Sequence, residues 1–244
     1  MQSPLEGIGD LGSLIAPIEP IDDPDVGIGR DFTSPSSTML VIFAAMGTRP
    51  PPPFHFFQIT TGMPAKRLFA RDPTRVWYHR GVPGFGDSID AVAGSLRKLI
   101  DEQRAERVIA LGSSAGGYAA LVFGTLLEAD LVLCFAPQTM LDPAWLAKIG
   151  DDRWRRRLKV LGGLGGPDSR YVDVREAILR DRRVNTAYEV HYPASHDWDV
   201  HHARHLEGIP GLALHPHQEK EHQFVQALQR SGALGQMLRA AVGD

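Results

Sequence analysis

The chain has 244 residues, 43% of them hydrophobic, and a formal net charge of -3. This length is sufficient for a sizeable core in one domain, or two at most, and the balanced charge gives no reason to expect nucleic acid or an anionic membrane as a partner. The single cysteine, Cys134, cannot form an internal disulfide and lies in an apolar run, where we expect it to be buried. Residues 1–12 lack the features of a secretory signal, and no apolar run approaches the roughly 18 residues of a membrane span. These features predict a cytoplasmic protein.

The predicted elements alternate between strands and helices along most of the chain. Residues 1–37 are rich in Pro, Gly, Asp and Ser and predict an irregular N-terminal arm, followed by one domain over residues 38–244. Short apolar runs predict strands at residues 39–44, 54–59, 75–78, 108–111, 131–135, 186–192 and 212–215. Helical spacing of apolar residues predicts helices at residues 87–102, 115–127, 173–182 and 199–206, and from His222 onward with a break at Gly232. This alternation predicts a mostly parallel sheet flanked by helices on both faces.

A Gly-x-Ser-x-Gly pattern lies between the predicted strand at 108–111 and the predicted helix that follows, with its serine at Ser114. A strand that turns into a helix within two residues strains the serine backbone and exposes the hydroxyl. Glycine is needed at Gly112 and Gly116, because side chains there would collide with the crossing strand and helix. The helix N-terminus favours negative charge that develops near the hydroxyl. The turn therefore predicts that Ser114 is a nucleophile.

The strand, turn and helix over residues 108–127 resemble the nucleophile elbow of the α/β-hydrolase superfamily. The resemblance extends from about residue 39 to the C-terminus, and more loosely the chain is similar to compact bacterial hydrolases that act around glycan or secretion pathways. It implies an α/β-hydrolase fold and a triad in the chain order serine, acid, histidine. It also implies that a lid would be inserted at residues 138–183, and because about 45 residues is short for a lid, we expect at most a small helical cap and a fairly open site.

The serine needs a base within hydrogen-bonding reach, and the base needs an acid that orients it. The resemblance places the acid after a late strand, where Asp199 is the preferred candidate and Asp197 the next. Asp142, which follows the preceding strand, is a third candidate. Either late aspartate could instead cap the helix that begins there.

Three histidines follow the last predicted strand. His222 is the preferred base, because it follows a loop and opens the C-terminal helix, the position that the resemblance gives to the histidine. His217 is the next candidate, and His215 still lies at the strand end. The alternative interpretation of His222 is an ordinary surface histidine at a helix start.

An oxyanion hole needs two backbone N–H groups aimed at the carbonyl oxygen. One is expected from Ala115, the residue after the nucleophile. By resemblance the other is expected from Met46, with Ala45 next, in the loop after the first strong strand. The alternative interpretation of that loop is a plain strand end.

Histidines and arginines cluster late in the chain. Eight of the ten histidines fall within residues 191–222, and His201 and His205 have the spacing of one helical face. The run lacks a His-Glu-x-x-His motif, so neither a metal nor another cofactor is predicted. The basic run at residues 153–157 could hold an anionic substrate, but it is interpreted as the solvated face of a helix.

The leading hypothesis is a serine esterase that cleaves a small-molecule ester or an acylated glycan through an acyl-enzyme. An acyltransferase with the same triad, such as one that acetylates a glycan, is the first alternative. A non-catalytic interaction module on a hydrolase scaffold is the second, and the intact elbow argues against it. The acyl and alcohol groups and the oligomeric state stay open.

Overall fold

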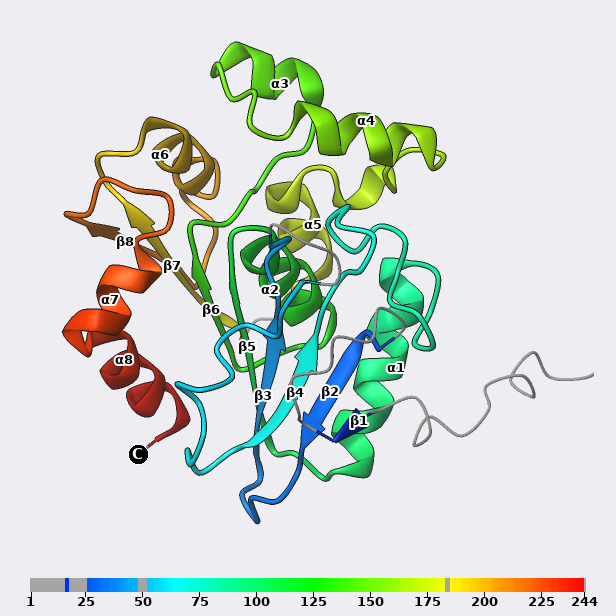
Figure 1. Ribbon diagram of the computed structural model, residues 1–244, viewed down its shortest axis with the longest axis vertical. Helices are drawn as coiled ribbons and strands as arrows, with labels where there is room; N and C mark the ends of the chain where they lie inside the picture. The colour runs from blue at the N-terminus through cyan, green and yellow to red at the C-terminus, as the bar shows by residue number, and fades with distance from the viewer. Residues whose placement is uncertain (1–15, 18–25, 48–51, 183–184, 244) are drawn as a thin grey trace, which may run out of the picture.

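The computed structural model describes residues 16–17, 26–47, 52–182 and 185–243, and in these ranges eight strands form one sheet (Figure 1). The strands, in chain order, are β1 (Ala16–Pro17), β2 (Ile28–Asp31), β3 (Thr38–Phe43), β4 (Lys66–Ala70), β5 (Arg107–Ser113), β6 (Leu131–Phe135), β7 (Ala187–Pro193) and β8 (Leu212–His217). Their order across the sheet is β1-β2-β4-β3-β5-β6-β7-β8, and every neighbouring pair is parallel except β2 with β4. The predicted mostly parallel sheet is confirmed.

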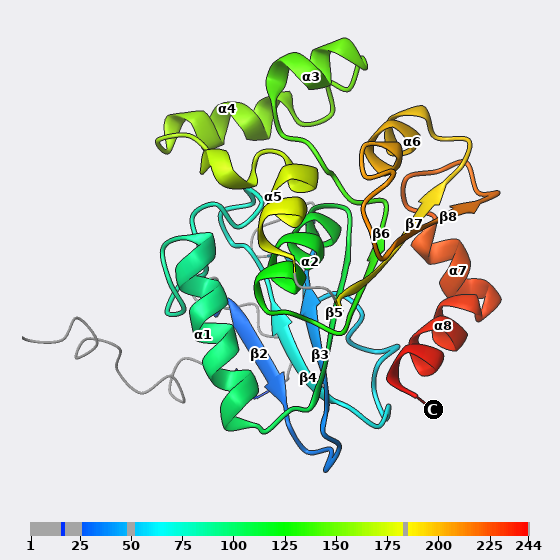
Figure 2. The ribbon, with the colours of Figure 1, turned by 180° about the vertical axis from the view of Figure 1, so that it is seen from behind.

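Helices cover both faces of this sheet (Figures 1 and 2). They are α1 (Ile89–Glu102), α2 (Ala115–Leu126), α3 (Pro143–Lys148), α4 (Arg155–Gly163), α5 (Val174–Asp181), α6 (Asp197–Arg204), α7 (Val225–Ser231) and α8 (Ala233–Val242). Side chains of α1, α2 and α5 pack on one face, and those of α7 and α8 pack on the other. The helices α3 and α4 lie at the top of Figure 1, beyond the carboxyl ends of the central strands. None of the described helices combines the length and the apolar character needed to cross a bilayer.

The two halves of the core follow from the alternation of side chains along the central strands. On β6, Val132 and Cys134 belong to the α1 and α2 side, whereas Leu133 and Phe135 belong to the α7 and α8 side. Each of the fully buried Val, Leu and Phe side chains stabilises the fold by about 1.5–3 kcal/mol. The Cys134 thiol is free and buried as predicted, and burial raises its pKa.

The strand predicted at residues 75–78 is wrong, because this segment forms turns in which the side chain of Asp72 binds the backbone. The Asp72 carboxylate accepts the backbone N–H groups of Val76 at 2.7 Å and of Tyr78 at 2.8 Å. Trp77 and Tyr78 both have positive φ values, which no strand residue adopts. The backbone N–H groups that would bond to a neighbouring strand in the predicted structure bond to a nearby carboxylate instead.

The strand predicted at residues 54–59 is also wrong, since the chain turns there and Thr60 donates from its backbone N–H and its hydroxyl to the carbonyl of Phe56. The strand β4 follows instead. Its polar start contains Arg67, whose guanidinium pairs with Asp31 at 2.6 Å. The prediction of an irregular arm is wrong at β1 and β2, which both join the sheet, while residues 1–15 and 18–25 lie outside the described residues.

The turn from β5 into α2 has no space for side chains at its glycines. A Cβ atom on Gly112 would lie 2.0 Å from the carbonyl oxygen of Gly116, and one on Gly116 would lie 2.2 Å from that of Phe43. Ser114 joins the strand to the helix with φ 54° and ψ -122°, a rarely populated conformation. The end of β3, the turn and α2 thus fix one another, and they place Ser114 at the carboxyl edge of the sheet.

We expect Gly116→Ala to lower the free energy of unfolding by about 1–3 kcal/mol, because the added methyl group must displace backbone atoms of β3. Gly94→Ala is the matched control: it lies in α1 with no atom within 4 Å of the added Cβ. That substitution should be neutral or stabilise by up to about 1 kcal/mol. Urea denaturation of the three proteins measures both effects, and an unchanged midpoint for Gly116→Ala would contradict the close packing.

Candidate active site

Three residues that are far apart in the sequence meet at the carboxyl end of the sheet. Ser114 stands between β5 and α2, Asp199 lies in the first turn of α6, and His222 lies between β8 and α7. Ser114 Oγ is 3.0 Å from His222 Nε2. His222 Nδ1 is 2.8 Å and 3.0 Å from the two carboxylate oxygens of Asp199. The structure therefore brings together the serine, the acid and the histidine that the sequence favoured.

The other candidates lie elsewhere. Asp197 is exposed to solvent, and the carboxylate of Asp142 caps the first turn of α3. His217 Nε2 is 2.9 Å from His191 Nδ1, and the ring of His215 stacks on that of His191. None of these side chains is part of the chain of hydrogen bonds that contains Ser114.

Gln138, in the loop after β6, is a further member of the site that the sequence did not indicate. Trp77 Nε1 can only donate, so the Gln138 atom that it faces at 3.3 Å is the amide oxygen. The amide nitrogen of Gln138 then donates to Ser114 Oγ at 3.1 Å. Since Ser114 Oγ accepts this bond, its own proton is free to point to His222 Nε2, and the Nδ1 proton of His222 points to Asp199.

The carboxylate of Asp199 is buried, with only 1% of the residue exposed. Burial alone would raise its pKa, but the hydrogen bond from His222 and the charges of His222, Arg153 and His196 outweigh burial and hold the pKa below its usual value. His196 Nδ1 lies 3.0 Å from Asp199 Oδ2, although it is not aligned for a hydrogen bond. Asp199 is therefore ionised at neutral pH, as an orienting acid must be.

Arg153 connects this acid to a second buried carboxylate. Its Nη1 lies 3.2 Å from Asp199 Oδ1, and its Nε and Nη2 donate to the two oxygens of Asp151 at 2.9 Å and 2.7 Å. The guanidinium also lies over the ring of Trp198, 4.8 Å from its centre. His202 Nε2 is 3.4 Å from Asp151 Oδ2, the oxygen that Arg153 Nη2 also contacts. Burial opposes ionisation of Asp151, but these contacts outweigh it and hold its pKa far below the usual value.

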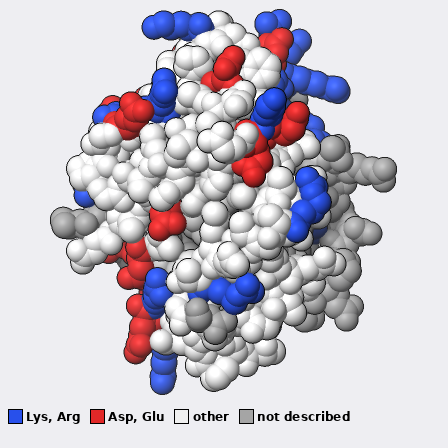
Figure 3. Space-filling model, turned by 90° about the vertical axis from the view of Figure 1, so that its left-hand side faces the viewer, with Lys and Arg blue, Asp and Glu red and all other residues white. Residues whose placement is uncertain are grey.

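The interpretation of residues 153–157 as a solvated helical face is wrong for Arg153 and correct for Arg155 and Arg156. Arg153 precedes α4, and only 17% of its side chain is exposed. Arg155 and Arg156 are exposed, and Figure 3 shows Lys and Arg side chains gathered at the upper end of the molecule, where α3 and α4 lie. The two buried carboxylates, which the sequence could not place, explain why Arg153 differs.

The predicted oxyanion donors belong to the two backbone segments that pack together at the turn, the start of α2 and the loop after β3. Ala115 is the first residue of α2, where an amide has no acceptor within its own helix. Met46 is in the loop after β3. The last residue of β3 is Phe43, and its carbonyl group packs against Gly116 of the turn. The side chain of Met46 is buried in the core, and Ala45 is half-buried. The pairing of these two amides at an oxyanion stays a prediction.

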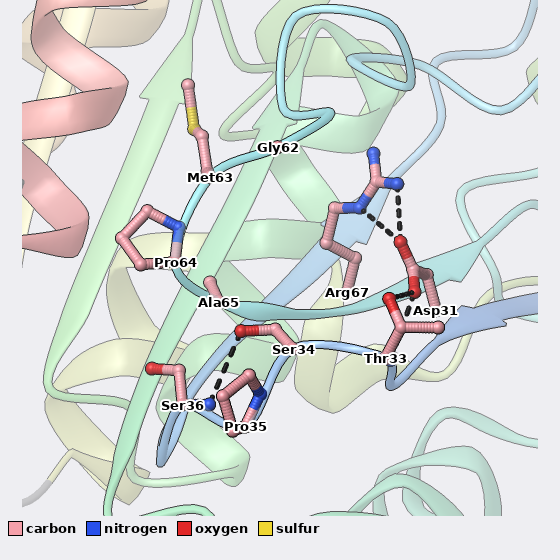
Figure 4. A pocket seen from close by; sticks show the side chains of 10 residues that line it. All are labelled: Asp31, Thr33, Ser34, Pro35, Ser36, Gly62, Met63, Pro64, Ala65 and Arg67. Carbon is pink, nitrogen blue, oxygen red and sulfur yellow. Dashed lines mark hydrogen bonds and ion pairs between the residues drawn. The ribbon is translucent and has the colours of Figure 1, made fainter.

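A separate pocket lies at the opposite edge of the sheet, at the amino ends of β3 and β4 (Figure 4). It is lined by the ion pair of Asp31 with Arg67 and by small polar side chains such as Thr33 and Ser36. Ser114 stands at the carboxyl end of β5, so this pocket is not part of the candidate active site.

Comparison with known proteins identifies the fold. No family model matches the chain, and no curated protein matches it in sequence. The capsule O-acetyltransferase of Neisseria meningitidis serogroup A superposes with a TM-score of 0.63 and 12% identity over 89% of this chain and 90% of that one. A putative esterase from Staphylococcus aureus superposes with a TM-score of 0.56 and 15% identity over 85% of this chain and 76% of that one. A carboxylesterase from the thaumarchaeon Nitrososphaera gargenis superposes with a TM-score of 0.55 and 12% identity over 88% of this chain and 94% of that one.

The chain therefore has an α/β-hydrolase fold, as the elbow and the alternation of elements predicted. Its neighbours in structure include esterases, serine hydrolases and an O-acetyltransferase. At these identities the likeness establishes the fold, and the assignment of a reaction rests on the side chains at the carboxyl end of the sheet.

Replacing Arg153 by methionine tests whether the buried ion pairs hold this site together. The change leaves Asp151 and Asp199 without their guanidinium partner, and loss of one partner of a buried pair costs about 3 kcal/mol. The pKa of Asp199 is low in the folded state, so its ionisation stabilises the fold at neutral pH, and this stabilisation is lost as the pH falls through the folded-state pKa. Arg153→Met should raise that pKa, so the loss should begin at a higher pH.

Urea denaturation between pH 3 and 7 measures both effects of Arg153→Met. Arg155→Met is the matched control, because Arg155 is exposed at the start of α4 and should change stability by less than about 0.5 kcal/mol. Equal stability of the two variants at every pH would show that the contacts of Arg153 are energetically unimportant.

Proposed function

We propose that the protein is a serine hydrolase that cleaves a carboxylic ester through an acyl-enzyme intermediate. The observation that carries the proposal is the hydrogen-bonded chain from Ser114 through His222 to Asp199 on an α/β-hydrolase fold. The strained serine at the start of α2, the basic nitrogen within reach and the ionised buried acid together meet the requirements of an activated serine nucleophile.

In the proposed reaction, Ser114 Oγ attacks the ester carbonyl carbon while His222 Nε2 takes the hydroxyl proton. The carbonyl oxygen becomes an oxyanion, which the backbone N–H groups of Ala115 and Met46 stabilise. The carbon–oxygen bond to the alcohol then breaks, and His222 returns the proton to the departing alcohol. Water attacks the acyl-enzyme in the same way and releases the carboxylic acid, so no cofactor is required.

Asp199 holds His222 in the correct tautomer and stabilises the imidazolium that forms in each step. Arg153 keeps Asp199 ionised, and Gln138 fixes the direction of the Ser114 hydroxyl. Both of these supporting residues come from residues 138–183, and we propose that this segment acts as a small cover over the site. The substrate in this proposal is a small ester or an acylated glycan.

Acyl transfer is the second candidate function. It is favoured by the likeness to a capsule O-acetyltransferase, which extends over nearly the whole of both chains. The first half of the reaction would be the same, and an acceptor hydroxyl would replace water in the second half. The two functions therefore differ in what captures the acyl group and not in the triad.

Removing the nucleophile or the acid should abolish ester cleavage. Ser114→Ala removes the attacking oxygen, and Asp199→Asn allows His222 to adopt the wrong tautomer, so each should lower kcat/KM for p-nitrophenyl acetate by roughly 1,000-fold or more. A fluorophosphonate probe should label the unmodified protein stoichiometrically, and mass spectrometry of its peptides should locate the adduct on Ser114.

The sequence supplies a neighbouring control for each of these variants. Ser113→Ala changes the other serine of the turn, and Asp197→Asn changes the exposed aspartate of the same helix. Both controls should retain labelling and at least about a third of the activity, a loss far smaller than the roughly 1,000-fold expected for the triad. Unchanged activity of Ser114→Ala, or a probe adduct on that variant, would remove the basis of the proposal.

Product analysis separates hydrolysis from transfer. If the protein is a hydrolase, p-nitrophenyl acetate should yield one acetate for each p-nitrophenol at every concentration of an added sugar alcohol or oligosaccharide, because water captures the acyl-enzyme. Acetate and acetylated sugar can be measured together by NMR spectroscopy. Acetylated acceptor that accumulates at the expense of acetate would favour the transferase instead.

A further inference from the structure

Four side chains of metal-ligating type lie together on the last two strands. Glu189 and His191 are two residues apart on β7, His215 and His217 are two residues apart on β8, and His191 is directly opposite His215 in the parallel register. Residues two apart on a strand point to the same face of a sheet. All four side chains therefore belong to one face, the one on which α7 and α8 pack.

The potential ligand atoms of three of these residues are close to one another. One atom from each of Glu189, His191 and His215 lies within 4.8 Å of the other two. His191 Nε2 is 3.6 Å from Glu189 Oε2, and the rings of His191 and His215 are stacked with their centres 4.5 Å apart. In a tetrahedral site with metal–nitrogen distances of about 2.0–2.1 Å, ligand atoms are about 3.4 Å apart. Small side-chain rotations would close the remaining gap.

Two atoms of this cluster lack a hydrogen-bond partner within the described residues. They are His191 Nε2 and His215 Nε2, both buried. His191 is only 5% exposed, and a buried polar atom without a partner is unfavourable. The chain satisfies the other nitrogen of His191, since its Nδ1 is 2.9 Å from His217 Nε2. When His191 Nδ1 donates that bond, its Nε2 presents a lone pair, the arrangement typical of metal-binding histidines.

We propose that Glu189, His191 and His215 bind a divalent transition-metal ion, with His217 as the outer hydrogen-bond partner of His191. Two imidazole nitrogens and one carboxylate form a donor set that suits zinc, with a fourth position left for water. The side chain of Glu189 is 44% exposed, so an ion can enter from solvent. The helical pair His201 and His205, which first suggested a metal, takes no part: His201 is exposed and His205 contacts Asp173.

The site is separate from the Ser114 hydrogen-bond chain, so we expect the ion to stabilise the structure and not to take part in the reaction. The metal would join β7 to the edge strand β8. The ring of His191 stacks on Phe135, and His217 packs against Phe224 at the start of α7. Binding should therefore also stabilise the region that leads to His222. The proposal does not depend on the proposed function.

The test uses full-length protein that has been freed of metal with a chelator and dialysed. Titration with zinc sulfate in a calorimeter should give a stoichiometry near one, and excess zinc should raise Tm by roughly 5 °C, since a ligand that binds only the folded state stabilises it. Cobalt(II), added in place of zinc, should give the visible absorption bands of a tetrahedral site. Absence of stoichiometric binding and of any rise in Tm would overturn the proposal.

Four variants locate the bound ion. His215→Gln and Glu189→Gln should each weaken zinc binding at least 10-fold, and the partly exposed position of Glu189 makes its variant the less disruptive of the two. The matched control His201→Gln should bind zinc as the parent does. His222→Ala should also bind normally; if zinc binding is lost in this variant and kept in the other three, the ion occupies the Ser114 site and the proposal is wrong.

Discussion

The close approach of backbones at the turn from β5 into α2 is the constraint on which the candidate site depends. The backbone lies so close to Gly112 and Gly116 that neither position can hold a methyl group, and at Gly116 the obstructing atom is the carbonyl oxygen of Phe43. The chain therefore passes from strand to helix within one residue, and Ser114 takes up the strain with a positive φ. This packing places the proposed nucleophile beside the loop that carries the proposed oxyanion donor Met46. Without this packing, Ser114 would not be held in a fixed position within hydrogen-bonding distance of His222.

Around that turn, the site is supported by buried charges and directed hydrogen bonds. Asp199 and Asp151 share one guanidinium, that of Arg153, and each carboxylate has a histidine nearby. Burying two carboxylates is unfavourable unless such partners are present. The segment over residues 138–183 therefore supplies Arg153 and Gln138 to the candidate site. Changes at Arg153 should therefore affect the ionisation of Asp199.

The sequence predicted the fold class and most elements, because their signals are local. Buried parallel strands are short apolar runs, and the elbow carries its glycines within five residues. The errors came from polar side chains that act on the backbone or over long range. Asp72 binds the N–H groups of residues 76 and 78 and turns a predicted strand, and Asp31 neutralises Arg67 so that a charged segment becomes β4. Neither effect is visible in apolar patterning.

By itself, the sequence predicted Ser114 as the nucleophile, His222 as the preferred base and the loop after the late strand as the source of the acid. The tertiary structure decided which of the two late aspartates contacts His222, and it is Asp199. Both lie in the first turn of α6, where side chains two residues apart point to nearly opposite sides of the helix, so only one can face His222. Tertiary contacts also bring Arg153 to Asp199 and Gln138 to Ser114. The register of β7 with β8 places His191 opposite His215. These contacts join residues distant in sequence, and only packing of the sheet and helices specifies them.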